Sequence, residues 1–268
     1  MGMIIADSVR NETSYFWGES NYIAEFWNCL TNITMIILAL LGLRSSIRHG
    51  HGKRVTAMYV GLLFVGCGSA CFHATLKYTT QLLDELPMLY VCAITFYLMV
   101  EIHKDVKFGA KFPVILGMFQ LAITVTYLFW VQNPIFHQAA FALTAIGSMF
   151  FGFKRLQALS PSRETQRTFN RLMLLGNLGM WGGFFVWNLD NIFCQQLRSY
   201  RTYLGTPLDA VLQLHGWWHI LTAYGSTSLI LWTHMLHLAH LRQDTIFCVE
   251  TFLGLFPYIE LRQPKKID

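Results

Sequence analysis

Charged residues are scarce in this chain of 268 residues, where Asp, Glu, Lys and Arg together make up only 13%. A soluble domain usually carries about 25% charged residues, so an ordinary water-soluble fold is disfavoured. The six cysteines include no Cys-x-x-Cys pair, which argues against both a disulfide framework and a zinc ribbon. The basic residues that give the net charge of +5 lie between apolar runs and form no single patch, so we expect no nucleic-acid partner.

Long apolar segments dominate the sequence instead, and 54% of the residues are hydrophobic. A helix needs about 20 predominantly apolar residues to cross a membrane. Seven segments meet this requirement, and short links rich in Gly, Pro, Arg and Lys separate them. The predicted spans are residues 23–43, 56–76, 82–102, 112–132, 134–153, 169–193 and 208–237. The sequence therefore predicts an all-α membrane protein, a bundle of seven transmembrane helices.

Lys and Arg are divided unequally between the two sides of this predicted bundle, with sixteen on one side and four on the other. Because basic residues collect on the cytosolic side, we predict a lumenal N-terminus and a cytosolic C-terminus. The predicted parts are a lumenal segment 1–22, a seven-helix domain 23–240 and a cytosolic tail 241–268. A glycosylation sequon at Asn11 and a C-terminal Lys-Lys-Ile-Asp, similar to the signal that retrieves proteins to the endoplasmic reticulum, agree with this orientation.

Histidines inside the predicted spans are the most unusual feature, because ionisable groups within a membrane are rare and mark functional sites. His215 and His219 are four residues apart, so both rings project from one helix face. The two imidazoles of an HExxH helix bind zinc with the same spacing. At about 1.5 Å per residue, His73 reaches the same depth from another helix. Three histidines would complete a catalytic zinc site with a fourth position open for water.

Two further polar residues lie at this depth. Asp84, in the first turns of the third predicted helix, is the candidate acid–base partner, and Ser69 lies one helical turn before His73, where its hydroxyl could stabilise an oxyanion. Simpler interpretations exist for each residue. Histidines in membranes often only join helices by hydrogen bonds, two histidines can ligate haem, and Ser69 in GCGSAC could be a small packing residue.

Other polar residues in the predicted spans have less specific interpretations. Three histidines at the cytosolic end of the last helix are expected to be solvated at the interface, and His137 is expected to cap a helix. A polar group near the lumenal end of the sixth helix forms either a structural network or the substrate entrance. The residues of these two groups are His234, His237 and His240, and Asn188, Asp190 and Asn191.

Six motifs between residue 22 and the tail closely resemble the alkaline ceramidases of the CREST superfamily, and their order is most similar to the alkaline phytoceramidase type. They are YIAEFWN, GSACFH, QLLDELPM, PIFHQ, WNLDNIFC and LHGWWHIL. The resemblance implies an intramembrane zinc-dependent amidase of the endoplasmic reticulum and Golgi that hydrolyses ceramides to a sphingoid base and a fatty acid. It implies that His73, His215 and His219 bind Zn²⁺ and that Ser69 and Asp84 are the catalytic polar pair. Ceramide and membrane lipid are the expected partners.

The resemblance also implies a calcium site in the lumenal loop before the first helix. The family loop is similar to DWCEENY, and this chain is several residues shorter there. Phe16 stands where the family has Asp, so with fewer oxygen ligands we expect Ca²⁺ to bind weakly or not at all. Gly18 replaces the family's cysteine, which leaves Cys194 without its implied disulfide partner. The matching calcium positions are Trp17, Glu19, Asn21 and Glu25.

Two other classes of function stay open on the sequence alone. The same superfamily includes the seven-helix adiponectin and progestin receptors, so a receptor with a structural or vestigial zinc site is the main alternative. Those receptors have a cytosolic N-terminus, opposite to the orientation predicted here. A transporter that relays protons through a His/Asp cluster is the second alternative. The sequence does not indicate the preferred acyl chain or the oligomeric state.

Overall fold

The computed structural model describes residues 23–102, 108–131, 133–205 and 207–262, and within these ranges the chain is mainly helical. The longer helices are α3 (Ile33–Arg48), α4 (Lys53–Thr75), α5 (Tyr78–Val100), α6 (Lys111–Phe129), α7 (Pro134–Gln157), α8 (Arg163–Ile192) and α10 (Leu214–His240). The shorter elements are α2 (Phe26–Thr31), α9 (Cys194–Leu204), the 3₁₀ helix η2 (Leu208–Leu212) and the strands β1 (Phe247–Phe252) and β2 (Phe256–Leu261).

Six helical segments of the described chain are long and apolar enough to cross a membrane, and they coincide with the first six predicted spans. These segments are Phe26–Arg48, Lys53–Thr75, Tyr78–Val100, Lys111–Phe129, Ile135–Gln157 and Arg163–Ile192. The seventh predicted span falls on η2 and α10, and α10 is not one of these six. Its 27 residues are long enough, but histidine, serine, threonine and glycine dilute its apolar character. The structure therefore supports a helical membrane bundle, whereas the seventh span and the orientation of the termini stay predictions.

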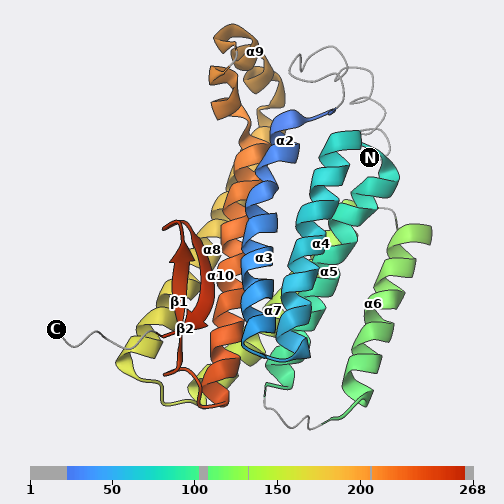
Figure 1. The fold of residues 1–268 in the computed structure, drawn as a ribbon. Helices are drawn as coiled ribbons and strands as arrows, with labels where there is room; N and C mark the ends of the chain where they lie inside the picture. Colours follow the sequence, from blue (N-terminus) through green and yellow to red (C-terminus); the bar gives the residue numbers. More distant parts are fainter. Residues whose placement is uncertain (1–22, 103–107, 132, 206, 263–268) are drawn as a thin grey trace, which may run out of the picture.

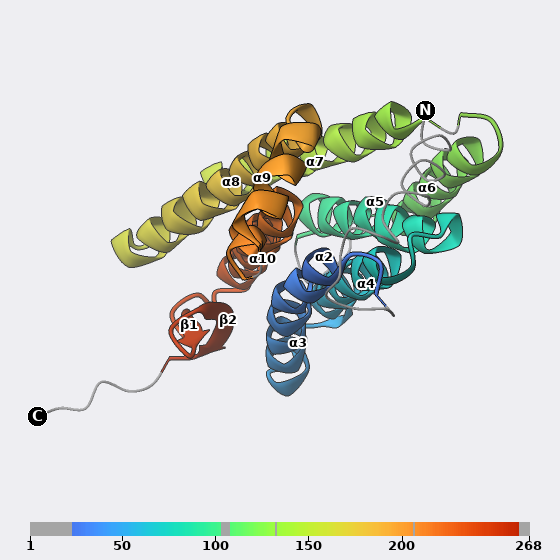
Figure 2. The same cartoon turned by 90° about the horizontal axis from the view of Figure 1, so that it is seen from above.

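Helix α10 lies at the centre of the bundle, between α8 on one side and α3, α4 and α5 on the other, while α6 lies at the periphery (Figures 1 and 2). Glycines allow its close approach to α8. A Cβ added at Gly179 of α8 would lie 2.6 Å from the Cα of Gly225, so a larger residue at this crossing would force the helices apart. The core fills the half of α10 that follows Gly225, where Trp232 packs against Phe169 of α8.

Burial of the C-terminal half of α10 contradicts the expected solvation of its histidines. His234 is fully buried and its Nδ1 lies 3.0 Å from the Tyr59 hydroxyl. His237 is also buried, and its Nδ1 lies 2.6 Å from the carbonyl oxygen of Ile102. His240 is partly buried, with its Nε2 3.2 Å from the carbonyl oxygen of Arg155. The interfacial interpretation was wrong because neighbouring helices, which the sequence of α10 cannot show, surround this end of the helix.

A β-hairpin follows α10, and the sequence did not predict it. Strands β1 and β2 pair antiparallel, with Phe247 opposite Leu261 and Phe252 opposite Phe256. Strand β2 packs along α3, where the Ser45 hydroxyl donates to the carbonyl of Ile259. The hairpin also contacts α10, since the rings of Tyr224 and Phe256 stack 6.4 Å apart. Residues 247–261 of the predicted tail thus pack on the helical domain (Figure 1), and the cytosolic location of the tail stays a prediction.

Candidate metal centre and active site

Three histidines from two helices meet at one end of the bundle. His73 lies in the last turn of α4, and His215 and His219 lie in the first two turns of α10. Their ring centroids are 4.9 Å (His73–His215), 4.7 Å (His73–His219) and 4.8 Å (His215–His219) apart, which makes an almost equilateral triangle. One donor atom from each residue lies within 4.8 Å of the others, so a single metal ion could bind among them. The structure thus brings together the three residues that the sequence singled out.

Hydrogen-bond partners favour a proton on Nδ1 of His73 and of His219. The Nδ1 of His73 lies 2.5 Å from Oε2 of Glu25, and a carboxylate can only accept this proton. The Nδ1 of His219 lies 3.0 Å from the Thr31 hydroxyl. That hydroxyl can donate to the carbonyl of Trp27 at 2.9 Å and accept from Nδ1, and the backbone carbonyl of Asn28 is a second acceptor for His219, whereas the Asn32 amide nitrogen lies farther from Nδ1, at 3.4 Å. A proton on Nδ1 of both rings leaves the Nε2 lone pairs for a metal.

This donor set fits zinc. Catalytic zinc is bound by three protein ligands, often imidazoles, with a fourth position for water or substrate. Metal-binding histidines commonly donate their other ring proton to a carboxylate or another acceptor, which sets the tautomer and raises the basicity of the ligand. Glu25 and Thr31 provide such acceptors here. Asn28 supports Glu25 in turn, because its Nδ2 donates to Oε2 at 3.1 Å.

The second functional pair lies beside the triangle. Ser69, which is buried, precedes His73 by one turn of α4, and its hydroxyl bonds to the carboxylate of Asp84 on α5. Asp84 is half-buried and lies close enough to His73 for their charges to interact. The structure therefore places the predicted pair together and next to the three imidazoles. Their catalytic role stays a prediction.

A close contact between α4 and α5 positions this pair. A Cβ added at Gly68 would lie only 1.9 Å from the carbonyl oxygen of Leu83, the residue before Asp84. Pro87, inside α5, has no N–H, so that same carbonyl lacks its normal helical donor four residues later. Glycine at 68 lets the backbone of α4 approach this carbonyl. Gly68 therefore allows the close packing here, and the packing interpretation of its neighbour Ser69 stays open.

Two neighbouring acids of α5 contact different helices. Glu85 accepts from the Tyr127 hydroxyl of α6 at 2.5 Å and from the amide of Gln81 at 2.9 Å. Its backbone carbonyl lies 2.9 Å from Nε2 of His137, which is buried. His137 therefore joins α7 to α5 and is not the expected cap, because Asn133 caps α7 by accepting from the N–H of Ile135. Glu85 holds helices together, which leaves Asp84 as the acid of α5 that lies beside the histidines.

The polar group near the end of α8 does not form a shared network. Asn188 donates to the carbonyl of Phe184 and Asn191 to that of Trp187, each one turn earlier in the same helix. Asp190 has a buried carboxylate oxygen with no hydrogen-bond partner among the described residues. A contact with substrate, the other interpretation of this group, stays a prediction. Three predicted calcium ligands, Trp17, Glu19 and Asn21, lie outside the described residues.

Sequence reasoning missed the acceptors that set the histidine tautomers. Glu25 was singled out only as a calcium ligand implied by resemblance, and Thr31 was not singled out at all. The available signal was an acid directly before the first apolar helix, in YIAEFWN. Its partner His73 is 48 residues away, so the contact depends on how α2 packs against the end of α4.

Comparisons with known proteins show the family of this chain. A family model described as Ceramidase matches residues 12–260. Alkaline ceramidase 3 of Mus musculus is 37% identical over 257 residues, which cover 93% of this chain and 92% of the mouse protein. An alkaline ceramidase of Saccharomyces cerevisiae is 32% identical over 254 residues, covering 86% of this chain and 77% of the yeast protein. An alkaline ceramidase of Drosophila melanogaster is 30% identical over 269 residues, covering 93% and 88%. Since both the family model and these relatives cover most of its length, the chain belongs to the ceramidase family.

Proposed function

We propose that this protein is a zinc-dependent amidase that hydrolyses ceramides within the membrane to a sphingoid base and a fatty acid. The observation that carries the proposal is the meeting of three imidazoles with the Ser69–Asp84 pair, in a chain of the ceramidase family. His73, His215 and His219 would hold the metal. When bound there, zinc would act as a Lewis acid toward the amide carbonyl and would lower the pKa of a water molecule.

Asp84 is the general base in this proposal. It accepts a proton from the attacking water and then donates it to the nitrogen of the leaving amine. Its hydrogen bond with Ser69 links the protonation of Asp84 to the stabilisation of the oxyanion by Ser69. The Ser69 hydroxyl has a single proton, which it can donate to only one acceptor at a time. While Asp84 is ionised, it accepts that proton. Once Asp84 is protonated it can donate instead, which leaves the Ser69 proton available to stabilise the developing oxyanion.

Glu25 and Thr31 act as positioning residues. They keep the ring protons of His73 and His219 on Nδ1 and fix the orientation of both rings. Glu25 is also the one described residue of the calcium positions implied by resemblance, so we infer a link between the loop before α2 and the metal centre. We expect calcium to bind weakly or not at all at these positions, because the shortened loop has fewer oxygen donors.

We further propose a location in the membranes of the endoplasmic reticulum and Golgi, with seven spans, a lumenal N-terminus and a cytosolic C-terminus. The division of Lys and Arg and the C-terminal Lys-Lys-Ile-Asp support this assignment. In this orientation the histidine triangle lies toward the lumenal leaflet, since it is at the end of α4 and the start of α10. Ceramide would then reach the site laterally from the bilayer.

The direct test is to measure zinc content and ceramide hydrolysis of the purified full chain, with and without added calcium. We expect about one zinc ion per chain and an activity that a chelator removes and zinc restores. His219→Ala should lose both metal and activity, whereas Asp84→Asn should lose activity and keep zinc. A folded, zinc-loaded protein that does not hydrolyse ceramides would refute the amidase proposal and favour the receptor.

A further inference from the structure

The β-hairpin has a charged base and an apolar tip. At the base, Nη1 of Arg262 lies 2.5 Å from Oε1 of Glu164, the second residue of α8. Nη1 of Arg48, the last residue of α3, lies 3.8 Å from Oε2 of Glu260. The hairpin tip, defined as residues 251–256, reads Thr-Phe-Leu-Gly-Leu-Phe. Because charged groups avoid hydrocarbon and apolar side chains avoid water, this polarity predicts that the two ends of the hairpin lie in different environments.

Side chains of the hairpin tip are largely uncovered within the described part of the chain. Leu253 is 75% exposed, Leu255 62% and Phe252 47%. The ring of Phe256 differs, because it stacks on the ring of Tyr224 of α10 and holds the tip against the bundle. Contiguous exposed apolar side chains of this kind mark a surface that meets a membrane or another protein.

The position of the hairpin along α3 gives the depth of the tip. Ser45, whose hydroxyl donates to the Ile259 carbonyl, precedes the end of α3 at Arg48 by three residues, or about 4.5 Å. Three residues of strand lead from Ile259 to Phe256 and add about 10 Å away from that end (Figure 1). Phe256 thus lies about 15 Å from the end of α3, which is half of the hydrocarbon thickness of about 30 Å. Since α3 belongs to the candidate span Phe26–Arg48, this depth is inside the membrane.

Helix α10 and the exposed face of α3 agree with this depth. Tyr224, the partner of Phe256, precedes the end of α10 at His240 by sixteen residues, or about 24 Å. Leu40 of α3 lies eight residues, or about 12 Å, from the end of that helix and is 48% exposed. An exposed leucine at this depth of an apolar span faces lipid. The tip therefore lies at a level where acyl chains cover the bundle.

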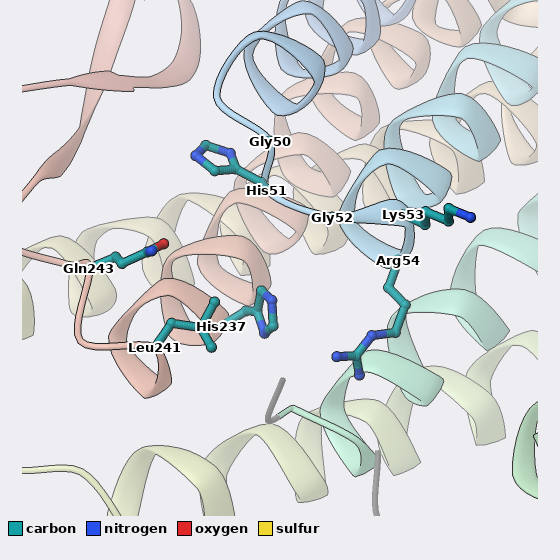
Figure 3. A pocket seen from close by; sticks show the side chains of 8 residues that line it. All are labelled: Gly50, His51, Gly52, Lys53, Arg54, His237, Leu241 and Gln243. Carbon is teal, nitrogen blue, oxygen red and sulfur yellow. The ribbon is translucent and has the colours of Figure 1, made fainter. Parts of the chain in front are cut away.

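The base of the hairpin lies at a polar level. The carbonyl of Gln243 accepts from the N–H of Phe247, the first residue of β1, at 3.2 Å. Gln243 also lines a pocket of about 580 Å³ together with Lys53 and Arg54, the first two residues of α4 (Figure 3). Lys and Arg collect where a membrane protein leaves the hydrocarbon. The hairpin thus starts near the interface, and its tip points along α3 and α10 toward the middle of the bundle (Figure 1).

Backbone groups near the tip suit a lipid environment. An unpaired N–H or C=O group is costly in hydrocarbon. Pro257, directly after the tip, has no N–H, and the Ile259 carbonyl accepts from the Ser45 hydroxyl. Within the turn, the N–H of Leu255 donates to the carbonyl of Phe252 at 3.1 Å. These features lower the cost of placing this end of the hairpin among acyl chains.

We propose that the hairpin tip is inserted among the acyl chains of the leaflet at which α3 ends and α8 begins, with the charged base at the headgroups. The depth of the tip and the exposed leucine of α3 at a similar depth favour acyl chains over a protein partner. In the predicted orientation this is the cytosolic leaflet, so residues 247–261 of the predicted tail form an additional membrane anchor. The inference requires a membrane-spanning bundle and does not depend on ceramide hydrolysis.

The depth of the tip can be measured on the full chain, with one copy in each phosphatidylcholine nanodisc. Trifluoromethylphenylalanine is introduced at Leu253, and fluorine NMR measures its relaxation by two agents. One is a phosphatidylcholine with a nitroxide at the middle of its acyl chain, and the other is a charged gadolinium chelate in water. We expect the ratio of lipid-borne to aqueous relaxation at position 253 to exceed that at position 261 about tenfold, because the charged chelate does not enter hydrocarbon.

Leu261 is the matched control, since it is an exposed leucine of the same hairpin but lies between Glu260 and Arg262 at the charged base. Leu121, in the middle of α6 and 49% exposed, provides the reference value for hydrocarbon. A ratio at position 253 close to that at position 121 supports the proposal. Relaxation by the aqueous chelate as strong as at position 261 would place the tip in water and overturn it. Protection of position 253 from both agents would also overturn it, because protein would then cover the tip.

Discussion

Replacing Gly68 by Ala tests whether the contact between α4 and α5 positions the proposed base. The added Cβ would lie 1.9 Å from the carbonyl oxygen of Leu83, whereas real Cβ contacts are essentially never below 3.0 Å. Because the obstructing atom belongs to the backbone, no side chain can rotate away, and α5 must move by about 1 Å relative to α4. Asp84 follows Leu83 directly and would move with it, away from Ser69 and His73.

A misplacement of about 1 Å in a catalytic group can reduce a rate about 100-fold. We therefore expect Gly68→Ala to lower kcat for ceramide hydrolysis by about that factor. Zinc content should stay near that of wild type, because the three histidines come from α4 and α10 and not from α5. The overpacked contact should also reduce stability by about 1–3 kcal/mol. Thermal unfolding and size-exclusion chromatography first establish that the variant is folded, and activity is then measured on that protein.

Gly182→Ala is the matched control, because a Cβ at this helical position of α8 meets no atom within 4 Å. It should keep wild-type activity. The reasoning is refuted if Gly68→Ala is folded and retains kcat within about threefold of wild type, since α5 would then not need this register to place Asp84. Loss of zinc together with activity would also refute it, because the damage would then lie in the metal centre.

Three further predictions concern the metal centre and the bundle. Glu25→Gln should weaken zinc affinity about 10- to 100-fold, because it removes the charge that His73 contacts; competition with a fluorescent chelator measures this, and unchanged affinity would exclude the role. Thr31→Val removes the acceptor for His219 and should weaken zinc binding about tenfold in the same assay, while Thr80→Val, on α5, should not. Gly179→Ala should lower thermal stability by about 1–3 kcal/mol, because its Cβ would overlap Gly225; an unchanged unfolding temperature would contradict this packing.

Depth along a helix can be calculated from sequence, and this explains why the histidine triangle was predictable. The rise per residue places His73 at the end of one span and His215 and His219 at the start of another. Rotation about the helix axes and the register between helices cannot be calculated in this way. The approach of Gly68 to Leu83 and the burial of His234 depend on both, so neither was predicted.

The hairpin and the tautomer-setting acceptors were unpredictable for a related reason. Residues 247–261 include several exposed apolar side chains, so the sequence alone does not distinguish this segment from an irregular tail. The strands become recognisable only once β1 and β2 pair and β2 lies along α3. Glu25 and Thr31 lie at the start of the first predicted span, which the structure describes as the short helix α2 followed by α3. Glu25, the N-cap of α2, and Thr31, its last residue, contact histidines on two other helices, and such contacts depend on helix packing that the sequence does not show.

The hydrogen bonds around the triangle also bear on the choice between a catalytic and a structural metal. A structural zinc site is closed by four protein ligands, whereas a catalytic site keeps one position open. In the described chain, the group able to hold one ion comprises only His73, His215 and His219. Glu25 and Asp84 are the nearby acids that could supply a fourth ligand, but Glu25 is bonded to His73 Nδ1 and Asp84 to Ser69. Each acid thus already has a hydrogen-bonding partner, and the cluster itself offers three ligand atoms, so the arrangement favours a site with three protein ligands over a closed one. A receptor with a closed zinc site would need a fourth protein ligand in the cluster.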